Sequence, residues 1–233
     1  MSDNPPILAR KHYKQSSVFF GNYLGATDMA RKSHWEGIYT TKTPTGVSWY
    51  QPHAAKSLEL IKRTGVNASA QIIDVGGGAS TLVDDLLAKG FRNLTVLDIS
   101  PTALEAAQQR LGARAAQEVK WIEADITQAV LPRHHFDVWH DRAVFHFLTE
   151  ADDRRRYVNG ASDALKPGGH IIMATFAADG ARQCSGLNVI RYSPEKLHAE
   201  LGGAFEIIES LEETHLTPFD TTQKFTYCLC RKR

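Results

Sequence analysis

Short apolar runs recur along the chain from residue 70 onward and are separated by amphipathic stretches. The runs "QIIDV" (71–75) and "LTVLDI" (94–99) are almost continuously apolar, as is typical of parallel strands buried on both faces. Later runs share this character, namely "VKWIEAD" (119–125), "FDVWHD" (136–141) and "HIIMATF" (170–176). The pattern therefore predicts a series of buried strands in one sheet.

The stretches between these runs have the periodicity of helices. Residues 82–87 place leucine and valine on one helical face after the first run. After the second run, Ser100 is a good N-cap and Gly112 a natural stop. A further helix, capped by Thr149 and ended by "LKPGG" (165–169), precedes the last run. Strands that alternate with helices predict a doubly wound, largely parallel sheet.

The two ends of the chain depart from this alternation. Residues 205–215 and 223–232 have the pattern of two longer strands joined as a hairpin, which fits an antiparallel edge on a parallel sheet. The N-terminal part is rich in aromatic side chains and is interrupted by glycine and proline. We therefore divide the chain into an N-terminal extension (1–33), an aromatic-rich cap or lid (34–69) and a core (70–233).

The composition narrows the classes of function. A chain of 233 residues, 42% hydrophobic and 23% charged, fits one domain with additions. Its 27 basic and 26 acidic residues give a net charge of +1, which favours neither nucleic acid nor an anionic membrane as partner. No apolar run approaches the roughly 18 residues of a membrane helix. With no signal core and three cysteines, an odd number, we expect a cytoplasmic protein.

The first predicted strand runs into the glycine-rich loop "DVGGGAS", which begins at Asp74. A nucleoside-triphosphate loop needs Gly-Lys-Ser/Thr, and no lysine is present here. A dinucleotide loop needs G-x-G-x-x-G, but Thr81 stands at the third glycine position. The remaining class is an adenosyl ligand without phosphate but with a cationic or polar tail. An acid directly before the glycines favours that class.

Two further acids stand at the tips of the next two strands. Asp98 ends the second strand, and a carboxylate there accepts hydrogen bonds from both hydroxyls of a ribose. Asp125 ends the third strand, where it can accept from an adenine amino group while Ile99 and Ile126 cover the ring. Singly, such acids are more typical of turns and helix caps. At three successive strand tips they predict an adenosyl site.

The segments "IIDVGGGAS", "LTVLDIS" and "IEADI" resemble the successive motifs of class I S-adenosylmethionine-dependent methyltransferases, and the resemblance covers about residues 34–233. It implies an α/β fold with a doubly wound seven-stranded sheet, mostly parallel with the last strand antiparallel. It also implies S-adenosylmethionine as cofactor, with S-adenosylhomocysteine as the product.

The same resemblance assigns roles to the cofactor residues. Asp74 and the backbone of Gly76, Gly77 and Gly78 would hold the methionine portion. Asp98 would bind the ribose, and the acid at the third strand tip the adenine amine. Gly77 departs from the family pattern, because many members carry a larger residue there.

An aromatic segment precedes the core. "HWEGIYTTKTPTGVSWY" is similar to the Trp-x-x-x-Tyr segment of several branches, including protein-lysine methyltransferases of the citrate-synthase-modifying kind. In those branches the segment closes over the cofactor, which implies that Trp35, Tyr39 and Trp49 form a lid. The alternative is that these residues only anchor an N-terminal helix.

A run of polar residues, His140, Asp141 and Arg142, lies at the tip of the fourth strand, where donor methyl and acceptor should meet. Methyl transfer is an in-line displacement, and a histidine near neutral pKa is the usual base where the acceptor carries a proton. We predict His140 as this base, or as a contact to the cofactor tail. Asp141 would orient His140 or fix the strand end, and Arg142 would hold an anionic acceptor or pair with Asp141.

The loop after the fifth strand supplies candidate substrate contacts, because loops at this end of an α/β sheet bind substrates. They are Arg182, Cys184, Arg191 and Tyr192, and with Arg142 they favour an anionic acceptor. The alternatives are solvated arginines and an inert thiol.

Other chemistries find less support. His134, His135, His140 and His146 lack the helical pair or cysteine spacing of a zinc site, so we predict no metal. No G-x-S-x-G elbow marks a hydrolase. The leading hypothesis is methyl transfer to a small-molecule acceptor. The alternatives are a protein-lysine methyltransferase and a non-catalytic S-adenosylmethionine-binding module.

Overall fold

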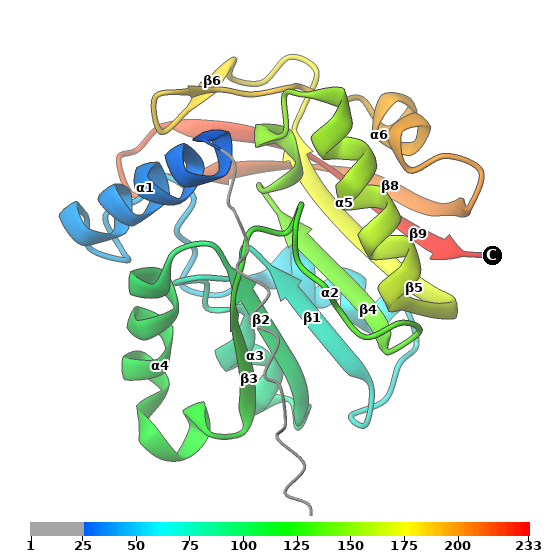
Figure 1. Cartoon of the computed structure of the whole chain (residues 1–233), viewed down its shortest axis with the longest axis horizontal. Helices are drawn as coiled ribbons and strands as arrows, with labels where there is room; N and C mark the ends of the chain where they lie inside the picture. Colours follow the sequence, from blue (N-terminus) through cyan, green and yellow to red (C-terminus); the bar gives the residue numbers. More distant parts are fainter. Residues whose placement is uncertain (1–25) are drawn as a thin grey trace, which may run out of the picture.

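The computed structural model describes residues 26–233, which form a seven-stranded sheet in the order β3-β2-β1-β4-β5-β9-β8 (Figure 1). The strands are β1 (Gln71–Val75), β2 (Asn93–Asp98), β3 (Val119–Glu123), β4 (Phe136–Arg142), β5 (Leu165–Phe176), β8 (Phe205–Leu216) and β9 (Thr222–Lys232). The pairings from β3 to β5 are parallel, and β9 pairs antiparallel with β5 and with β8. The predicted seven-stranded sheet with an antiparallel last strand is confirmed.

Helices cover both faces of this sheet (Figure 1). They are α2 (Ala55–Arg63), α3 (Leu82–Ala88) and α4 (Pro101–Ala116) on one face, and α5 (Ala151–Ala164) and α6 (Pro194–Leu201) on the other. Each face has its own buried apolar cluster, one including Leu60 and Val138, the other including Trp139 and Tyr157. The central strands are therefore buried on both sides, which explains their nearly continuous apolar runs.

Some element ends differ from the predicted ones. Ser100 caps α4 as predicted, its hydroxyl accepting a backbone N–H of the first turn at 3.2 Å. Gly112 (φ 75°) kinks α4 but does not end it. The predicted Thr149 cap is wrong, because Glu150 holds the N-cap position and Thr149 still belongs to the preceding turn. "LKPGG" starts β5 at Leu165, since this segment pairs with β4 across a bulge.

The cap over the sheet begins with α1 (Ala26–Thr41), which lies across the carboxyl ends of the central strands (Figure 1). The predicted boundary after residue 33 falls inside this helix. Residues 1–25 of the predicted extension lie outside the described residues. Two shorter elements complete the same end of the molecule: the turn η1 (Phe145–Phe147), and a hairpin of β6 (Gln183–Cys184) and β7 (Leu187–Asn188). The rest of the domain division stays a prediction.

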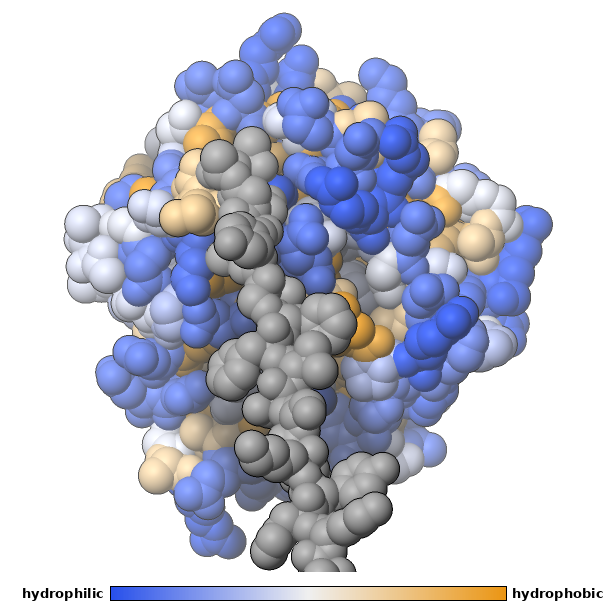
Figure 2. All heavy atoms as spheres, in the orientation of Figure 1, coloured by the Kyte–Doolittle hydropathy of each residue, from blue (hydrophilic) through white to orange (hydrophobic). Residues whose placement is uncertain are grey.

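The face shown in Figure 2 is mostly hydrophilic, with hydrophobic side chains scattered among the polar ones. Within residues 26–233, no helix has both the length and the apolar character needed to cross a bilayer. The cytoplasmic location expected from the sequence stays a prediction.

Candidate active site

A pocket opens beyond the carboxyl ends of β1, β2, β3 and β4. β1 has β2 on one side and β4 on the other, and this reversal of winding is where α/β sheets bind ligands. The pocket encloses about 780 Å³ of space, part of it open to solvent. Its lining residues are Arg31, Trp35, Tyr39, Trp49, Val75, Gly76, Leu97, Asp98, Ile99, Ala124, Asp125, Ile126, Arg142, Ala143, Val144, Phe147, Leu148 and Cys184.

The glycine loop after β1 is packed directly onto two acids. Gly76 has a φ of 66°, a backbone conformation that favours glycine, and it lines the pocket. A Cβ on Gly77 would lie 2.6 Å from Oδ2 of Asp74, and one on Gly78 would lie 2.5 Å from Oδ2 of Asp98. The departure at Gly77 therefore has a steric reason, because the Asp74 carboxylate occupies the space of a larger side chain.

Asp98 lines the pocket and is almost fully buried, 6% exposed. Its Oδ1 accepts the backbone N–H of Ser100 at 2.9 Å. Burial raises the pKa of Asp98 to about 7, and the nearby charge of Asp74 adds to the rise. A hydrogen-bond donor or a cation placed at this carboxylate would therefore be bound strongly.

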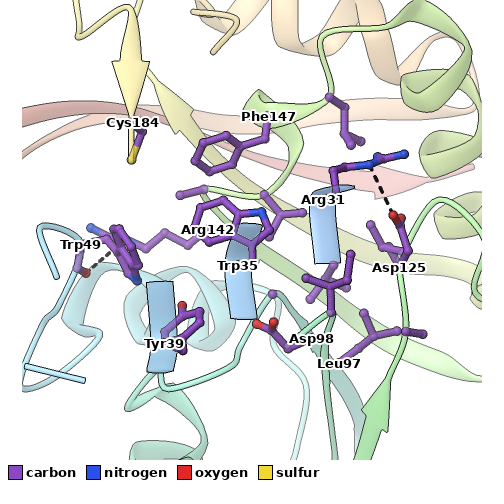
Figure 3. Close-up of a pocket in the computed structure, with 18 residues that line it drawn as sticks. Arg31, Trp35, Tyr39, Trp49, Leu97, Asp98, Asp125, Arg142, Phe147 and Cys184 are labelled. Atoms are coloured by element: carbon purple, nitrogen blue, oxygen red, sulfur yellow. Dashed lines mark hydrogen bonds and ion pairs between the residues drawn. The ribbon is translucent and has the colours of Figure 1, made fainter. Parts of the chain in front are cut away.

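Asp125 and the two predicted isoleucines also line the pocket. Oδ1 of Asp125 accepts from both the backbone N–H and the hydroxyl of Thr127, at 2.8 and 2.7 Å. Its Oδ2 lies 3.5 Å from Nε of Arg31, on α1 (Figure 3). Ile99, which follows β2, and Ile126, which follows Asp125, add apolar side chains to the lining of the pocket. Sequence reasoning missed Arg31, because it lies in the segment assigned to the extension.

The three predicted lid aromatics all line the pocket. Trp35 contacts Trp49 edge to face at a centroid distance of 6.0 Å and Phe147 at 4.8 Å, and Tyr39 lies 6.3 Å from Trp49. Burial, together with the nearby charge of Asp98, raises the pKa of Tyr39 above its ordinary value, so its hydroxyl stays a neutral donor. These aromatics thus form a wall over the strand tips, and their role as a closing lid stays a prediction.

Polar contacts of α1 hold this wall in place. Glu36 accepts from the hydroxyl of Ser100 at 2.6 Å and also contacts the hydroxyl of Thr102, both at the start of α4. On the other side, Arg31 lies 3.3 Å from Asp153 of α5. Sequence reasoning missed Glu36 as well, although it stands inside the Trp-x-x-x-Tyr segment.

His140 does not reach the pocket. It is 2% exposed, and it lies opposite Asp74 in the β1–β4 pairing. Its Nδ1 lies 2.7 Å from Oδ1 of Asp74 and its Nε2 lies 2.8 Å from Oγ of Ser57, on α2. Both ring nitrogens are thus engaged below the glycine loop, and the prediction of His140 as the base at the acceptor is wrong.

Asp141 faces the opposite side of the sheet, because successive strand side chains alternate. It is fully buried and accepts from the backbone N–H groups of Val144 and Phe145 at 2.9 and 3.1 Å, and from the Tyr157 hydroxyl at 2.5 Å. It fixes the strand end, one of the two predicted roles, and it neither orients His140 nor takes part in the pocket.

Arg142 is the one member of the trio that lines the pocket. Its Nε donates to the hydroxyl of Tyr227 at 3.0 Å, and Nη1 donates to the backbone carbonyl of Trp49 at 3.1 Å. Its guanidinium lies over the ring of Phe225, 4.4 Å from the centroid. Nη2 lies 3.8 Å from Oε2 of Glu213 and has no hydrogen-bond partner among the described residues. Arg142 is therefore paired with Glu213, not with Asp141.

The predicted substrate loop contributes a single residue. Cys184, on the β6–β7 hairpin, points into the pocket near Trp49 (Figure 3), and burial raises the pKa of its thiol. Arg182 is exposed, and Arg191 donates to the carbonyl of Gly180 at 3.2 Å. Tyr192 is 2% exposed and belongs to the apolar cluster beneath the sheet. The structure places Arg182, Arg191 and Tyr192 outside the pocket lining, so the geometry does not bring them to the candidate site.

The chain is similar to several methyltransferases. Residues 73–171 match a family model described as a methyltransferase domain. EEF1A lysine methyltransferase 2 of Homo sapiens is 21% identical over 196 residues, which are 78% of this chain and 77% of that protein.

Solved structures show the same fold. A structure from work on the conversion of a disulfide bond into a thioacetal group during echinomycin biosynthesis has a TM-score of 0.70 at 18% identity, covering 87% of this chain and 92% of that chain. The 1,6-didemethyltoxoflavin-N1-methyltransferase of Burkholderia thailandensis, with bound 1,6-didemethyltoxoflavin and S-adenosylhomocysteine, has a TM-score of 0.65 at 16% identity, covering 96% and 99%. The matching domain model and the curated relatives show that the chain is an S-adenosylmethionine-dependent methyltransferase, and the solved structures show its fold.

Proposed function

We propose that this methyltransferase acts on a small-molecule acceptor that carries an anionic group and binds beside Arg142. The proposal rests on the distribution of charge in the pocket. Asp98 and Asp125 lie toward one end, and Arg142 lies near Cys184 at the other (Figure 3). A cofactor with a cationic tail matches the first end, and an anionic acceptor matches the second.

The residues beneath the glycine loop fit such a cofactor. In the described part of the chain, no lysine or arginine pairs with Asp74 or Asp98, and the side chain in contact with the Asp74 carboxylate is His140. Buried carboxylates are stable only when charges or donors compensate them. S-adenosylmethionine supplies a sulfonium, an ammonium and an electrophilic methyl group when bound. Asp74 and the loop glycines would hold its methionine portion, and Asp98 its ribose hydroxyls.

Asp125 is the residue we assign to the adenine. Its Oδ2 has no hydrogen-bond partner among the described residues, so an amino group can donate to it. Ile99 and Ile126 offer apolar surface to the faces of a planar base. Arg31 at 3.5 Å from this oxygen would stay close to the same ring.

Arg142 supports the anionic acceptor. Three of its contacts fix the guanidinium of this side chain, which is only 10% exposed, while Nη2 has no hydrogen-bond partner among the described residues and lies 3.8 Å from Oε2 of Glu213. A carboxylate or an ionised oxygen could accept a hydrogen bond from Nη2 without any reorientation of the guanidinium. The neighbouring rings of Trp49 and Phe147 favour an acceptor with a planar, apolar body.

Within the described part of the chain, no pocket histidine is in place to remove a proton from the acceptor. No histidine is among the described residues that line the pocket, and the raised pKa of Cys184 keeps it a thiol. Arg142 lowers the cost of an ionised acceptor instead, because its positive charge lies at the same end of the pocket. The rate then comes mainly from holding donor and acceptor in line and excluding water.

A protein-lysine acceptor is the second candidate, and the similarity to EEF1A lysine methyltransferase 2 favours it. A lysine must lose its proton before it attacks, and an acidic acceptor channel would help to admit the cationic side chain. The acceptor end of this pocket presents Arg142 instead. The charge at the acceptor end therefore favours the small-molecule hypothesis.

The test is an unbiased transfer assay. The protein is incubated with S-adenosylmethionine labelled on the methyl group and with cell extract separated into metabolite, protein and RNA fractions. We expect label in the metabolite fraction, on a compound retained by anion exchange. Arg142→Met should abolish the transfer while calorimetry shows that S-adenosylhomocysteine still binds.

The matched control is Arg155→Met, which removes an exposed arginine on α5 whose partner within residues 26–233 is Asp152. It should transfer label as wild type does. Label found in the protein fraction would overturn the small-molecule assignment in favour of the lysine acceptor. Absence of S-adenosylhomocysteine binding would overturn the cofactor assignments instead.

A further inference from the structure

We propose that His140 and Ser57 are positioning residues, which orient the Asp74 carboxylate beneath the glycine loop to receive the ammonium group of the cofactor. The inference rests on the proposed cofactor assignment and adds two residues to it. It also gives a function to the buried histidine that the sequence placed at the acceptor.

The three side chains form one buried chain of hydrogen bonds. Ser57 is 1% exposed on α2, His140 is 2% exposed on β4, and Asp74 is 5% exposed on β1. The two contacts, Ser57 Oγ to Nε2 at 2.8 Å and Nδ1 to Asp74 Oδ1 at 2.7 Å, have hydrogen-bond length. With the aspartate ionised, Nδ1–H donates to the carboxylate and Nε2 accepts from the serine hydroxyl.

This chain leaves one oxygen of Asp74 for another partner. Oδ2 is buried and has no hydrogen-bond partner among the described residues. It lies where Gly77 would carry its Cβ, 2.6 Å away, and Cγ1 of Val96 lies 2.9 Å from the same point. The imidazole therefore fixes the carboxylate with its free oxygen against the loop that holds the methionine portion.

A buried, unpaired carboxylate oxygen is costly unless something compensates it. In the described part of the chain, no lysine or arginine pairs with Asp74, and its histidine contact satisfies the other oxygen. An ammonium group matches this need in charge and in donor capacity. The ionised carboxylate accepts only, so it requires Nδ1–H, and the serine hydroxyl then donates to Nε2.

The test compares two ligands that share the adenosine part. S-adenosylhomocysteine carries the ammonium group, whereas 5′-methylthioadenosine lacks it. His140→Gln places its amide near Ser57 and loses the contact to Asp74, whereas His140→Asn places an amide where Nδ1 lies and keeps that contact. Titration calorimetry measures the dissociation constant of each ligand for each protein.

We expect His140→Gln and Ser57→Ala to raise the dissociation constant for S-adenosylhomocysteine by about tenfold or more. A loss of this size is typical of a misaligned charged hydrogen bond. The affinity of both variants for 5′-methylthioadenosine should equal that of wild type. His140→Asn should weaken S-adenosylhomocysteine binding less than His140→Gln does, because it keeps the contact to Asp74 and loses only the one to Ser57. Because Ser57→Ala only removes a hydroxyl, it keeps the test valid where the histidine variants fold poorly.

Equal weakening of both ligands in His140→Gln and Ser57→Ala would overturn the proposal, since a merely structural role affects the whole site. Unchanged binding of both ligands would overturn it too. Asp98→Ala serves as the reference, because loss of a ribose contact should weaken both ligands alike. If wild type bound neither ligand, the cofactor assignment itself would fail, and that result is distinct from the other two.

Discussion

Asp98 is a carboxylate whose burial has a measurable consequence for stability. The pKa of Asp98 in the folded protein is raised to about 7, whereas in the unfolded chain it has its ordinary value near 4. Between about pH 4 and 7 the folded state therefore holds a proton that the unfolded state has released. The free energy of unfolding falls as the pH rises through this window, because the folded state binds more protons than the unfolded chain does.

Asp98→Asn should remove this part of the pH dependence. The variant should gain stability relative to wild type between pH 4.5 and 7.5, by on the order of 2–4 kcal/mol. Urea unfolding at several pH values measures the difference. Asp141, whose pKa is raised to about 6, is present in both proteins, so its contribution to the pH dependence cancels in the comparison. Asp152→Asn, an exposed change, should follow the wild-type curve, and a constant difference between wild type and Asp98→Asn would contradict the prediction.

Tyr157 tests the structural role of Asp141. Its hydroxyl donates to Asp141 at 2.5 Å and accepts from Nε1 of Trp139 at 2.9 Å, all within a fully buried cluster. Tyr157→Phe should lower the free energy of unfolding by about 1–3 kcal/mol, because two buried polar groups lose a partner. Calorimetric titration should show unchanged S-adenosylhomocysteine binding. A large loss of affinity would instead place Asp141 in the site.

The separate roles of the three residues at the end of β4 were not predictable from the local sequence. His140, Asp141 and Arg142 are consecutive, so alternate members face opposite sides of the sheet, and only packing decides which side is solvent, core or pocket. Asp98 and Asp125 were predictable, because the order of strand, turn and helix alone puts them at strand tips. Glu36 carried no such signal, since its partners belong to a helix far along the sequence.

At the scale of elements, α1 is held over the pocket by polar and aromatic contacts of partly exposed side chains. None of its described side chains is buried, and it is held by Glu36 at the start of α4 and by Arg31 and Lys32, which pair with Asp125 and Glu123. Such elements open locally at low free energy. A helix of this kind can admit a ligand and then cover it, whereas the strand tips stay fixed.

Glu36→Ala should therefore loosen α1 without unfolding the sheet. Hydrogen exchange should speed up by about tenfold within residues 26–41, since a cap contact and its charge are lost, and little elsewhere. The dissociation rate of S-adenosylhomocysteine should rise. Glu118→Ala, which removes an exposed pair with Arg92, is the control. Uniformly faster exchange in all helices would mean that Glu36 supports the whole fold and does not hold the cap.

The sheet could be predicted in outline because its signal is repeated and local. Each buried strand carries its own apolar run, and the alternation with helices fixes the parallel pairing. The end of α5 at Ala164 and the hairpin over the pocket were not predictable in this way. Both depend on contacts with distant strands, such as the pairing of Leu165 with Phe136 across a bulge.

At the scale of the whole molecule, the pocket joins segments that lie far apart in the chain. Its walls run from Arg31 on α1 to Cys184 on the β6–β7 hairpin, and between them they include the tips of β1, β2 and β4. A ligand that contacts all of these stabilises the fold as one unit, because it binds the folded state and not the unfolded chain.

S-adenosylhomocysteine at about 100 times its dissociation constant should add about 2.7 kcal/mol to the free energy of unfolding. For a chain of this size, that corresponds to a rise in Tm of roughly 5–11 °C. Differential scanning calorimetry measures the shift, and Asp98→Ala should reduce it at the same ligand concentration, while Asp152→Ala should retain it. A ligand that raises Tm and slows hydrogen exchange around β2, but not within residues 26–41, would show that the cap opens separately from the liganded sheet. The covering role of α1 would then have to be rejected, because closure by α1 requires that ligand, cap and strand tips form one cooperative unit.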